Sequence, residues 1–419
     1  MNALPKVLAL APYCDGLDVG EAWCAHQWIS QLSRHAQVTL LTLRRKNHTP
    51  ASVQLPNVEV IEWDERFFSP RFSRLSSMLK PSYLAFYVQA RRWIKSNLEQ
   101  GRSFDIAHQF TPIALRYPSP LTNLPIPYVI GPLGGSLDTP EGFADECRSS
   151  AGYTRLRSLD RWRLRYDPLL RRSYTGAAAL LGVAPYVGEL LQHVSPKRFE
   201  VISELGIDSL AAPRESTMTG TQLRLVHVGR AVRTKGLRDA IRALSRLPQD
   251  VSVHLDVAGQ GEELSLCRDE ASRLGVEKNI TFHGQISRDR VEELYAQADA
   301  FLFPSFREPS GSVVFEALRN GLPVITTDLG GPGFVVDESC GITVPAIEPQ
   351  QLADDLASAI TRLARDPALR LELAKGARER ISHIGLWDKK IRWLTGLYAE
   401  LIVAEHKPDI MEVISHANN

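Results

Sequence analysis

The segment REPSGSVVFEALRNGLPVI, from Arg307 to Ile325, decides the fold predicted for this chain. It follows the run Asp299–Pro304, which is short, apolar and ended by proline, the pattern of a buried strand. From Ser312 to Arg319 the apolar residues recur at helical spacing, and a glycine and a proline then stop the helix. The apolar run Leu322–Leu329 comes next. The segment therefore predicts a strand, a loop, a helix and a second strand in succession.

Two carboxylates frame the loop and the start of this helix. Glu308 lies in the loop after the carboxyl end of the first strand, where open α/β sheets bind ligands. The backbone N–H groups of Ser310–Val313, which include those of Gly311 and Ser312, point out of the helix N-terminus and suit a phosphate. Glu316 follows Ser312 by four residues, so at about 3.6 residues per turn both share one helix face.

Acids beside a phosphate site have a purpose if they hydrogen-bond hydroxyl groups, because a carboxylate only accepts hydrogen bonds. One acid would bind the hydroxyls of a sugar and the other those of a ribose, with the helix end between them for phosphates. This predicts a site for a nucleotide-sugar. The alternative is that Glu316 is a solvated acid on the helix surface and that Glu308 only complements the helix dipole.

A second loop carries cations that fit the same ligand. The segment HVGRAVRTKGLRDAIRAL places Arg230 and Lys235 at the carboxyl end of a predicted strand, and Gly236 before a helix. Two cations facing the helix end of the Glu308 segment would hold a diphosphate and neutralise it as a leaving group. The alternative is ordinary surface charge.

Three further glycine-bearing strand ends are weaker candidates. Gly259 belongs to VAGQGEEL after a strand, although such pairs of glycines often only form tight turns. Gly284, in FHGQIS, follows another strand, where exposed backbone can contact a nucleobase. In the first half of the chain, Gly20 ends a loop that can approach a phosphate or an acceptor closely.

One histidine is a candidate in the first half. His108 lies at the end of the run DIAHQF, and the next strand end, Gly131–Ser136, is rich in glycine. A histidine at a strand end has a structural reading as well as a catalytic one, and the sequence leaves both open.

Length, charge and cysteine content exclude several classes of protein. The chain has 419 residues, with 49 Lys and Arg against 48 Asp and Glu, so we expect two domains and no nucleic-acid partner. Five scattered cysteines indicate a reducing compartment, and the start of the chain does not read as a signal peptide. No apolar run is long enough for a transmembrane helix. The chain has no Asp-x-Asp pair, so we expect no divalent metal. We expect a cytoplasmic location.

Strand-like apolar runs alternate with helical patterns along the chain, which predicts parallel sheets flanked by helices. The polar stretch Ala211–Gln222 separates two such sets. We therefore predict two doubly wound domains, residues 1–210 and 222–390, facing one another across a cleft. A long amphipathic helix pattern follows near the end of the chain, with no strand after it. The predicted strands are Lys6–Tyr13, Gln37–Leu43, Val58–Trp63, Asp105–Phe110, Pro127–Leu133, Ala178–Ala184, Phe199–Leu205, Leu223–Arg230, Val253–Gly259, Ile280–Gly284, Ala300–Ser305, Pro323–Leu329 and Gly341–Pro345.

Two segments of the first half mix arginine with aromatic residues, Arg66–Lys95 and Glu146–Tyr174. One reading is contact with an anionic membrane surface or with a lipid-diphosphate acceptor, which would make the protein peripheral at the inner face of a membrane. The other reading is ordinary helices with arginine on the solvent face.

Over nearly its whole length the chain resembles glycosyltransferase family 4, the retaining enzymes of the GT-B fold. The most specific element is the family's E-x7-E motif, matched by Glu308 and Glu316. The segments VGRAVRTKG, AGQGEEL and LYAQADAFLFPS appear in the family's order and spacing. Two features depart from the family. The Gly-Gly near the start is matched only by Gly20, and the glycine-rich Gly131–Ser136 holds no histidine, which leaves His108, one strand earlier, as the candidate for that role.

The resemblance implies that residues 1–210 form a Rossmann-like, acceptor-binding domain and residues 222–390 a donor-binding domain, with the helix within residues 391–419 packing back on the first domain. It also implies a role for each matched residue. Arg230 and Lys235 would hold the donor diphosphate, with backbone N–H groups of Gly311–Val313, Val313 included, on the phosphate. Glu308 would touch the donor sugar near the reacting carbon, and Glu316 the ribose. The implied activity is retaining transfer of a sugar from a nucleotide-diphosphate sugar to a hydroxyl of a saccharide or lipid-linked saccharide, in assembly of a bacterial surface polysaccharide or glycoconjugate, with no cofactor. The alternatives are a nucleotide-sugar epimerase, a sugar phosphorylase, or a non-catalytic binding protein of this fold.

Overall fold

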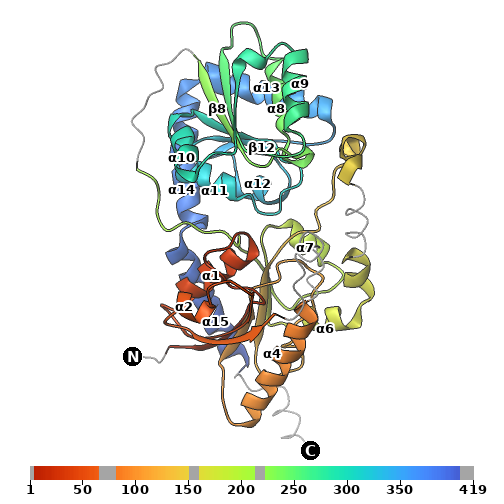
Figure 1. The fold of residues 1–419 in the computed structure, drawn as a ribbon, viewed down its shortest axis with the longest axis vertical. Helices are drawn as coiled ribbons and strands as arrows, with labels where there is room; N and C mark the ends of the chain where they lie inside the picture. Colours follow the sequence, from red (N-terminus) through yellow and green to blue (C-terminus); the bar gives the residue numbers. More distant parts are fainter. Residues whose placement is uncertain (1–3, 66–81, 151–159, 213–221, 406–419) are drawn as a thin grey trace, which may run out of the picture. The chain divides into compact units, whose positions relative to one another are not determined.

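A computed structural model describes residues 4–65, 82–150, 160–212 and 222–405 (Figure 1). Parts of both arginine-rich segments, most of the proposed linker and the end of the C-terminal tail lie outside these residues. By their contacts the residues form two compact units, each described here by itself. The first comprises residues 1–135, 158–204 and 388–419, and the second comprises residues 136–157 and 205–387.

The first unit is built on a parallel sheet of seven strands, in the order β3-β2-β1-β4-β5-β6-β7. Its central strands are buried along their whole length after the first residue of β1, as expected where helices cover both faces of a parallel sheet. The strands are β1 (Lys6–Leu10), β2 (Gln37–Arg44), β3 (Glu59–Asp64), β4 (Ile106–Gln109), β5 (Tyr128–Leu133), β6 (Ala179–Gly182) and β7 (Phe199–Val201).

Helices follow most of these strands in the chain. They are α1 (Glu21–Leu32), α2 (Ala51–Gln54), α4 (Ser82–Glu99), α6 (Pro168–Gly176) and α7 (Tyr186–Leu190). The long amphipathic pattern near the end of the chain forms α15 (Trp387–Glu405), and its residues from Asp388 onward belong to the first unit. Tyr398 of α15 is fully buried there.

The second unit is built on a parallel sheet of six strands, in the order β10-β9-β8-β11-β12-β13. These strands are β8 (Leu223–Val228), β9 (Val253–Ala258), β10 (Ile280–Gly284), β11 (Ala300–Phe303), β12 (Val324–Thr327) and β13 (Gly341–Val344). Its helical elements are η2 (Glu141–Phe143), η3 (Asp145–Ser150), η4 (Arg233–Lys235), α8 (Leu237–Leu244), α9 (Leu264–Arg273), η5 (Glu277–Asn279), α10 (Arg288–Gln297), α11 (Ser312–Arg319), α12 (Gly330–Val335), α13 (Pro349–Arg365) and α14 (Pro367–Ile384).

Alternating side chains of this second sheet enter two separate cores, one on each face. Leu302 of β11 joins a core with α8, α9 and α13, whereas its neighbours Phe301 and Phe303 join a core with α10, α11 and α14. A strand that buries both alternating sets of side chains reads as a continuous apolar run, which is why these runs predicted the strands. Every predicted strand overlaps one strand of the two sheets.

The predicted fold class is thereby confirmed as two Rossmann-like, doubly wound α/β sheets with C-terminal helices. Among the described residues, the helices are all too short or too polar to cross a bilayer.

Candidate active site

The strand order of the second sheet reverses between β8 and β11. The chain continues from β8 to β9 on one side, and from β11 to β12 on the other. The loops that leave the carboxyl ends of β8 and β11 therefore turn away from each other, and such a reversal point is where open α/β sheets bind ligands. The β8 loop contains Arg230 and Lys235, and the β11 loop contains Glu308.

Lys235 and Glu308 meet at this point. The Nζ of Lys235 forms an ion pair and a hydrogen bond with Oε2 of Glu308, and the two side chains are only 12% and 19% exposed. The ammonium group also lies 5.7 Å from the centroid of the Phe303 ring, in a cation–π contact. The cation and the first acid that the sequence analysis singled out are thus brought together.

A glycine makes the approach of the two loops possible. Gly236, directly after Lys235, has φ +74°, and a Cβ there would stand 2.0 Å from the carbonyl oxygen of Pro304. Ser305 is fully buried and donates from Oγ to the Thr234 carbonyl at 2.9 Å. The Ser305 carbonyl accepts from Thr327 Oγ1 at 2.7 Å, which joins this loop to β12 as well.

The backbone of Glu308 is held from the other side. Its carbonyl oxygen accepts a hydrogen bond from the N–H of Gly331 at 2.9 Å, at the start of α12. Gly330 has φ +64°, and a Cβ there would come within 2.2 Å of the same oxygen. Because only glycine fits these contacts, the Glu308 backbone has a defined position.

Helix α11 begins where the sequence predicted, at Ser312. Gly311 is its N-cap, with φ 80° and ψ 60°, and no side chain caps the helix. The side chain of Ser312 is exposed and that of Val313 is half-buried. An N-terminus without a side-chain cap leaves its first N–H groups for an anion or water, and the phosphate contact stays a prediction.

Glu316 lies on α11 and is half-buried. The hydroxyl of the buried Tyr295 donates a hydrogen bond to its Oε2 at 3.2 Å. Burial raises the pKa of the Glu316 carboxyl, and the hydrogen bond from Tyr295 only partly offsets this. Tyr295 stands 21 residues earlier, on α10, and the sequence analysis did not identify it.

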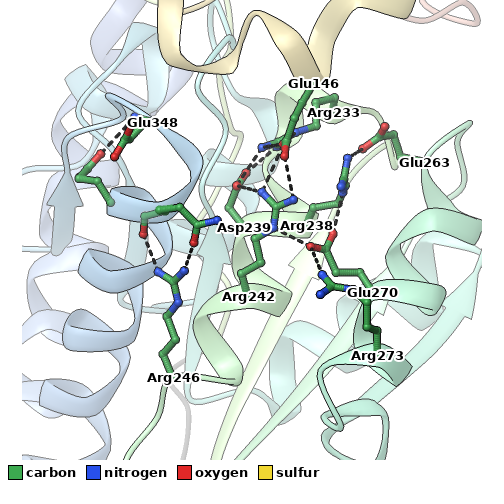
Figure 2. Close-up of polar contacts among 12 residues, drawn as sticks. Glu146, Arg233, Arg238, Asp239, Arg242, Arg246, Glu263, Glu270, Arg273 and Glu348 are labelled. Atoms are coloured by element: carbon green, nitrogen blue, oxygen red, sulfur yellow. Dashed lines mark hydrogen bonds and ion pairs between the residues drawn. The ribbon is translucent and has the colours of Figure 1, made fainter.

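Arg230 is exposed, and so is free to reach a ligand, whereas Arg233, three residues on, is buried. The guanidinium of Arg233 donates to both oxygens of Asp239, at 2.6 and 2.9 Å, within the polar cluster of Figure 2. The sequence alone does not show that Arg230 is exposed and Arg233 buried, because the partners of each arginine depend on the fold.

Gly259 and Gly284 lie at the carboxyl ends of the neighbouring strands β9 and β10, which approach each other closely. The N–H of Gly259 donates to the Gly284 carbonyl at 2.8 Å, and that of Gly229 donates to the Ala258 carbonyl at 3.0 Å. Gly259 has φ +138°, and a Cβ there would lie 1.8 Å from the Gly229 carbonyl oxygen. The glycines therefore allow the ends of β8, β9 and β10 to pack closely, and their contact with a nucleotide stays a prediction.

The structure argues against a catalytic role for His108, and we drop that prediction. The side chain is 0% exposed, stacks on Phe110 with ring centroids 3.8 Å apart, and has both ring nitrogens engaged. Nδ1 pairs with the Tyr398 hydroxyl, and Nε2 lies 2.8 Å from the Gly131 carbonyl oxygen. Burial lowers its pKa to about 3, so the ring is neutral and structural.

Gly20 stays exposed at the N-cap of α1, with φ +67° and nothing within 4 Å of an added Cβ. Its position is compatible with the predicted approach of an acceptor, and its role stays a prediction.

Comparison with solved structures defines the class of fold. HepE of Anabaena, in complex with UDP and glucose, aligns over 94% of this chain and 100% of its own, with a TM-score of 0.61 and 17% identity. The glycosyltransferase WaaG, involved in lipopolysaccharide biosynthesis, aligns over 93% of this chain and 100% of its own, with a TM-score of 0.57 and 22% identity. The chain thus has the GT-B fold.

Residues 210–380 match the family model described as "Glycosyl transferases group 1". The match lies in the second half of the chain, and this part of the chain is similar to that family of glycosyltransferases.

Curated relatives match part of the chain as well. The glycogen synthase of Mycobacterium tuberculosis is 31% identical over 215 residues, 51% of each chain. The lipopolysaccharide glucosyltransferase WaaG of Escherichia coli is 34% identical over 158 residues, 37% of this chain and 40% of its own. This chain thus covers about half or less of the length of these relatives.

Proposed function

We propose that this protein is a retaining glycosyltransferase that moves a sugar from a nucleotide-diphosphate sugar to an acceptor hydroxyl. The observation that carries the proposal is the Lys235–Glu308 pair at the strand-order reversal, with the exposed Arg230 in the same loop as Lys235. A cation for a diphosphate and a carboxylate for sugar hydroxyls are thereby within reach of one ligand.

Each group has a distinct task in this proposal. Arg230, Lys235 and the N-terminus of α11 bind the diphosphate and stabilise the charge that develops on it as the bond to the sugar breaks. When the donor binds, Lys235 exchanges Glu308 for a phosphate oxygen, which releases the carboxylate of Glu308 to accept from sugar hydroxyls. Glu316, positioned by Tyr295, accepts from the ribose.

The proton of the acceptor hydroxyl passes to the departing phosphate on the same face of the sugar. No side-chain base is needed for this step, which agrees with the structural setting of His108.

We propose that the acceptor binds the first unit near Gly16–Glu21 and Gly131–Ser136, and that it is a saccharide or a lipid-linked saccharide of a surface polysaccharide or glycoconjugate. Relatives from Rhizobium meliloti that are named for lipopolysaccharide core biosynthesis support that class.

A panel of nucleotides tests the donor site. Binding of UDP, GDP, ADP and dTDP would be measured by calorimetry on the wild type and on the Arg230→Ala/Lys235→Ala double variant. UDP is the first choice because HepE binds it. Selective binding of one nucleotide that is lost in the double variant supports the donor site, and no binding by any of them contradicts it.

Turnover then separates the proposed transferase from the other readings of the fold. A transferase needs an acceptor and releases nucleoside diphosphate. An epimerase needs no acceptor, a phosphorylase needs free phosphate, and a binding protein holds the nucleotide-sugar unchanged.

We further propose that the protein touches an anionic membrane at its inner face through the arginine-rich part of the first unit. Trp162 and Tyr166 are 58% and 56% exposed, with ring centroids 5.7 Å apart, and Leu169 nearby is 44% exposed. Exposed arginines accompany them, at positions Arg161, Arg165 and Arg172. Amphipathic aromatic rings with cations fit an anionic lipid interface.

Cosedimentation with vesicles tests this contact. The wild type should bind vesicles that contain anionic lipid, and Trp162→Ala/Tyr166→Ala should bind them less. Leu371→Ala, at an exposed apolar residue of α14, is the control and should bind as the wild type does. Equal binding by all three proteins would contradict the proposal.

A further inference from the structure

Residues 136–150 lie in the chain between β5 and β6 of the first sheet, yet they belong to the second unit. They form the short helices η2 and η3. Gly142 lies so close to the chain at Ile347 that an added Cβ would stand 2.3 Å from the Ile347 carbonyl oxygen. We call residues 136–150 the docking segment.

The docking segment contacts the β8 loop through Arg233. Nε of Arg233 donates to Glu146 Oε2 at 2.6 Å, and the Arg233 side chain is only 5% exposed (Figure 2). Its guanidinium also lies 5.3 Å from the Phe143 ring centroid and 5.2 Å from that of Phe306. A buried guanidinium must have its charge compensated, so Glu146 and Asp239 together fix where Arg233 lies.

The same segment also contacts the β11 loop. The rings of Phe143 and Phe306 stack with centroids 4.2 Å apart and an interplanar angle of 27°. Nη1 of Arg307 donates to Thr139 Oγ1 at 2.7 Å. Phe306 and Arg307 directly precede Glu308, so the segment supports both loops whose side chains meet at the strand-order reversal.

Glu146 stays ionised in this setting. Burial alone would raise the pKa of its carboxyl, but Arg242 and Arg233 together lower it to about 2. Glu146 also accepts from Arg242 Nη2 at 2.9 Å, so one carboxylate joins η4 to α8.

We propose that Glu146 is a positioning residue for donor binding. Through Arg233 it fixes the short helix η4, and thereby places Lys235, two residues further on, for the donor diphosphate. The docking segment is thus part of the donor site although it comes from the other half of the chain. This inference rests on the proposed function, because it assumes that Lys235 binds a nucleoside diphosphate.

Glu146→Gln is the test, measured on the full chain. The amide keeps the shape of the side chain but removes its charge. We expect the Kd for the nucleoside diphosphate that the wild type binds to rise by about tenfold, and KM for the donor to rise with it. The kcat at saturating donor should fall less, because Glu146 does not touch the reacting atoms.

Glu270→Gln is the matched control. Glu270 is 6% exposed and accepts from Arg238 and Arg242, each at 2.7 Å, in the same polar cluster (Figure 2). It makes no hydrogen bond to η4 among the described residues. We expect the Glu270→Gln variant to have a lower melting temperature than the wild type, and the same Kd for the nucleoside diphosphate.

The possible outcomes separate the two proposals. A wild-type Kd in Glu146→Gln, or the same loss of affinity in Glu270→Gln, would overturn the positioning role and leave the donor site standing. A wild type that binds no nucleoside diphosphate would overturn both. If Glu146→Gln does not fold, Glu146→Asp, which keeps the charge on a shorter side chain, should weaken binding in the same direction, and unchanged binding would count against the role.

Discussion

Lys235 and Glu308 are 73 residues apart in the chain and form an ion pair at the point where the strand order of the second sheet reverses. The pair compensates both charges. A diphosphate can replace Glu308 as the partner of Lys235, and a sugar hydroxyl can replace Lys235 as the partner of Glu308. In the function proposed above, the ion pair holds both side chains in place for the donor.

Substitution of the two partners should have different effects. Glu308→Gln should lower kcat by about 10²-fold or more, because it removes a charge that acts near the reacting carbon, while nucleotide affinity is retained. Lys235→Ala should instead raise the nucleotide Kd by about tenfold or more, because it removes a cation from the diphosphate. Steady-state kinetics and calorimetry on each variant separate these effects.

An exposed acid of the same unit serves as the control. Glu379 is 63% exposed and pairs only loosely with Lys375, at 3.8 Å. Glu379→Gln should leave kcat and Kd unchanged. Turnover like that of the wild type in Glu308→Gln would refute the role assigned to Glu308.

Glu316→Gln should separate binding from stability. Burial raises the pKa of the Glu316 carboxyl above its ordinary value of 4.5. Between 4.5 and the folded-state value, the folded protein holds more protons than the unfolded chain, so this group lowers stability as pH rises through that window. A glutamine cannot ionise and still accepts from Tyr295. The variant should therefore be at least as stable as the wild type at pH 7, and should bind nucleotide about tenfold more weakly.

Urea unfolding at pH 4 and pH 7, with calorimetry at pH 7, checks both parts. A marked loss of stability at pH 7 would show that the carboxylate supports the fold. Unchanged nucleotide affinity would remove Glu316 from the donor site.

Gly236→Ala tests the close approach of the two loops. The position combines φ +74° with a Cβ contact of 2.0 Å to the Pro304 carbonyl, so alanine must shift the backbone as well as adopt a left-handed conformation. Gly275 has nearly the same φ, +70°, and nothing within 4 Å of an added Cβ. Gly275→Ala should cost roughly 1 kcal/mol of stability, and Gly236→Ala about 2 kcal/mol more and much of the nucleotide affinity.

The comparison of the two alanine variants isolates the loop contact, because the conformational strain is nearly the same. Equal losses of stability and unchanged nucleotide binding in both would show that the approach of Gly236 to Pro304 has no role in the site.

The sequence predicted those features of the fold and the site that depend on the local pattern of residues. The β11–α11–β12 unit follows from apolar runs and helical spacing, and α11 begins at Ser312 as expected. The position of Glu308 after a strand end then follows from the rules of parallel α/β sheets.

Features that depend on distant contacts were not predictable in this way. The setting of His108 is decided by Tyr398, 290 residues away, and the burial of Arg233 by Glu146, 87 residues away. Neither pairing leaves a local periodicity. The sequence analysis therefore took His108 for a catalytic candidate and did not identify Arg233, Tyr295 or the docking segment.

We expect Lys390 to make the stability of the protein depend on pH. This residue of α15 is 3% exposed, donates to the Ser203 carbonyl, and has its ammonium 4.9 Å from the centroid of the Trp28 ring. Burial lowers its pKa from 10.5 to about 7, although Glu204 and Cys24 act in the opposite direction. Between these two pH values the unfolded chain binds more protons than the folded protein, so the free energy of unfolding rises with pH.

We expect a rise on the order of 2 kcal/mol from this group between pH 7 and pH 9. Lys390→Met keeps an unbranched apolar side chain beside Trp28 and cannot titrate, so it should remove this rise and stabilise the protein at pH 7. Lys389→Met, at the adjacent half-buried lysine, is the control and should keep the wild-type dependence. Urea unfolding of the three proteins at pH 7, 8 and 9 gives the comparison. If Lys390→Met shows the same rise as the wild type, the Lys390 ammonium is not the group that titrates.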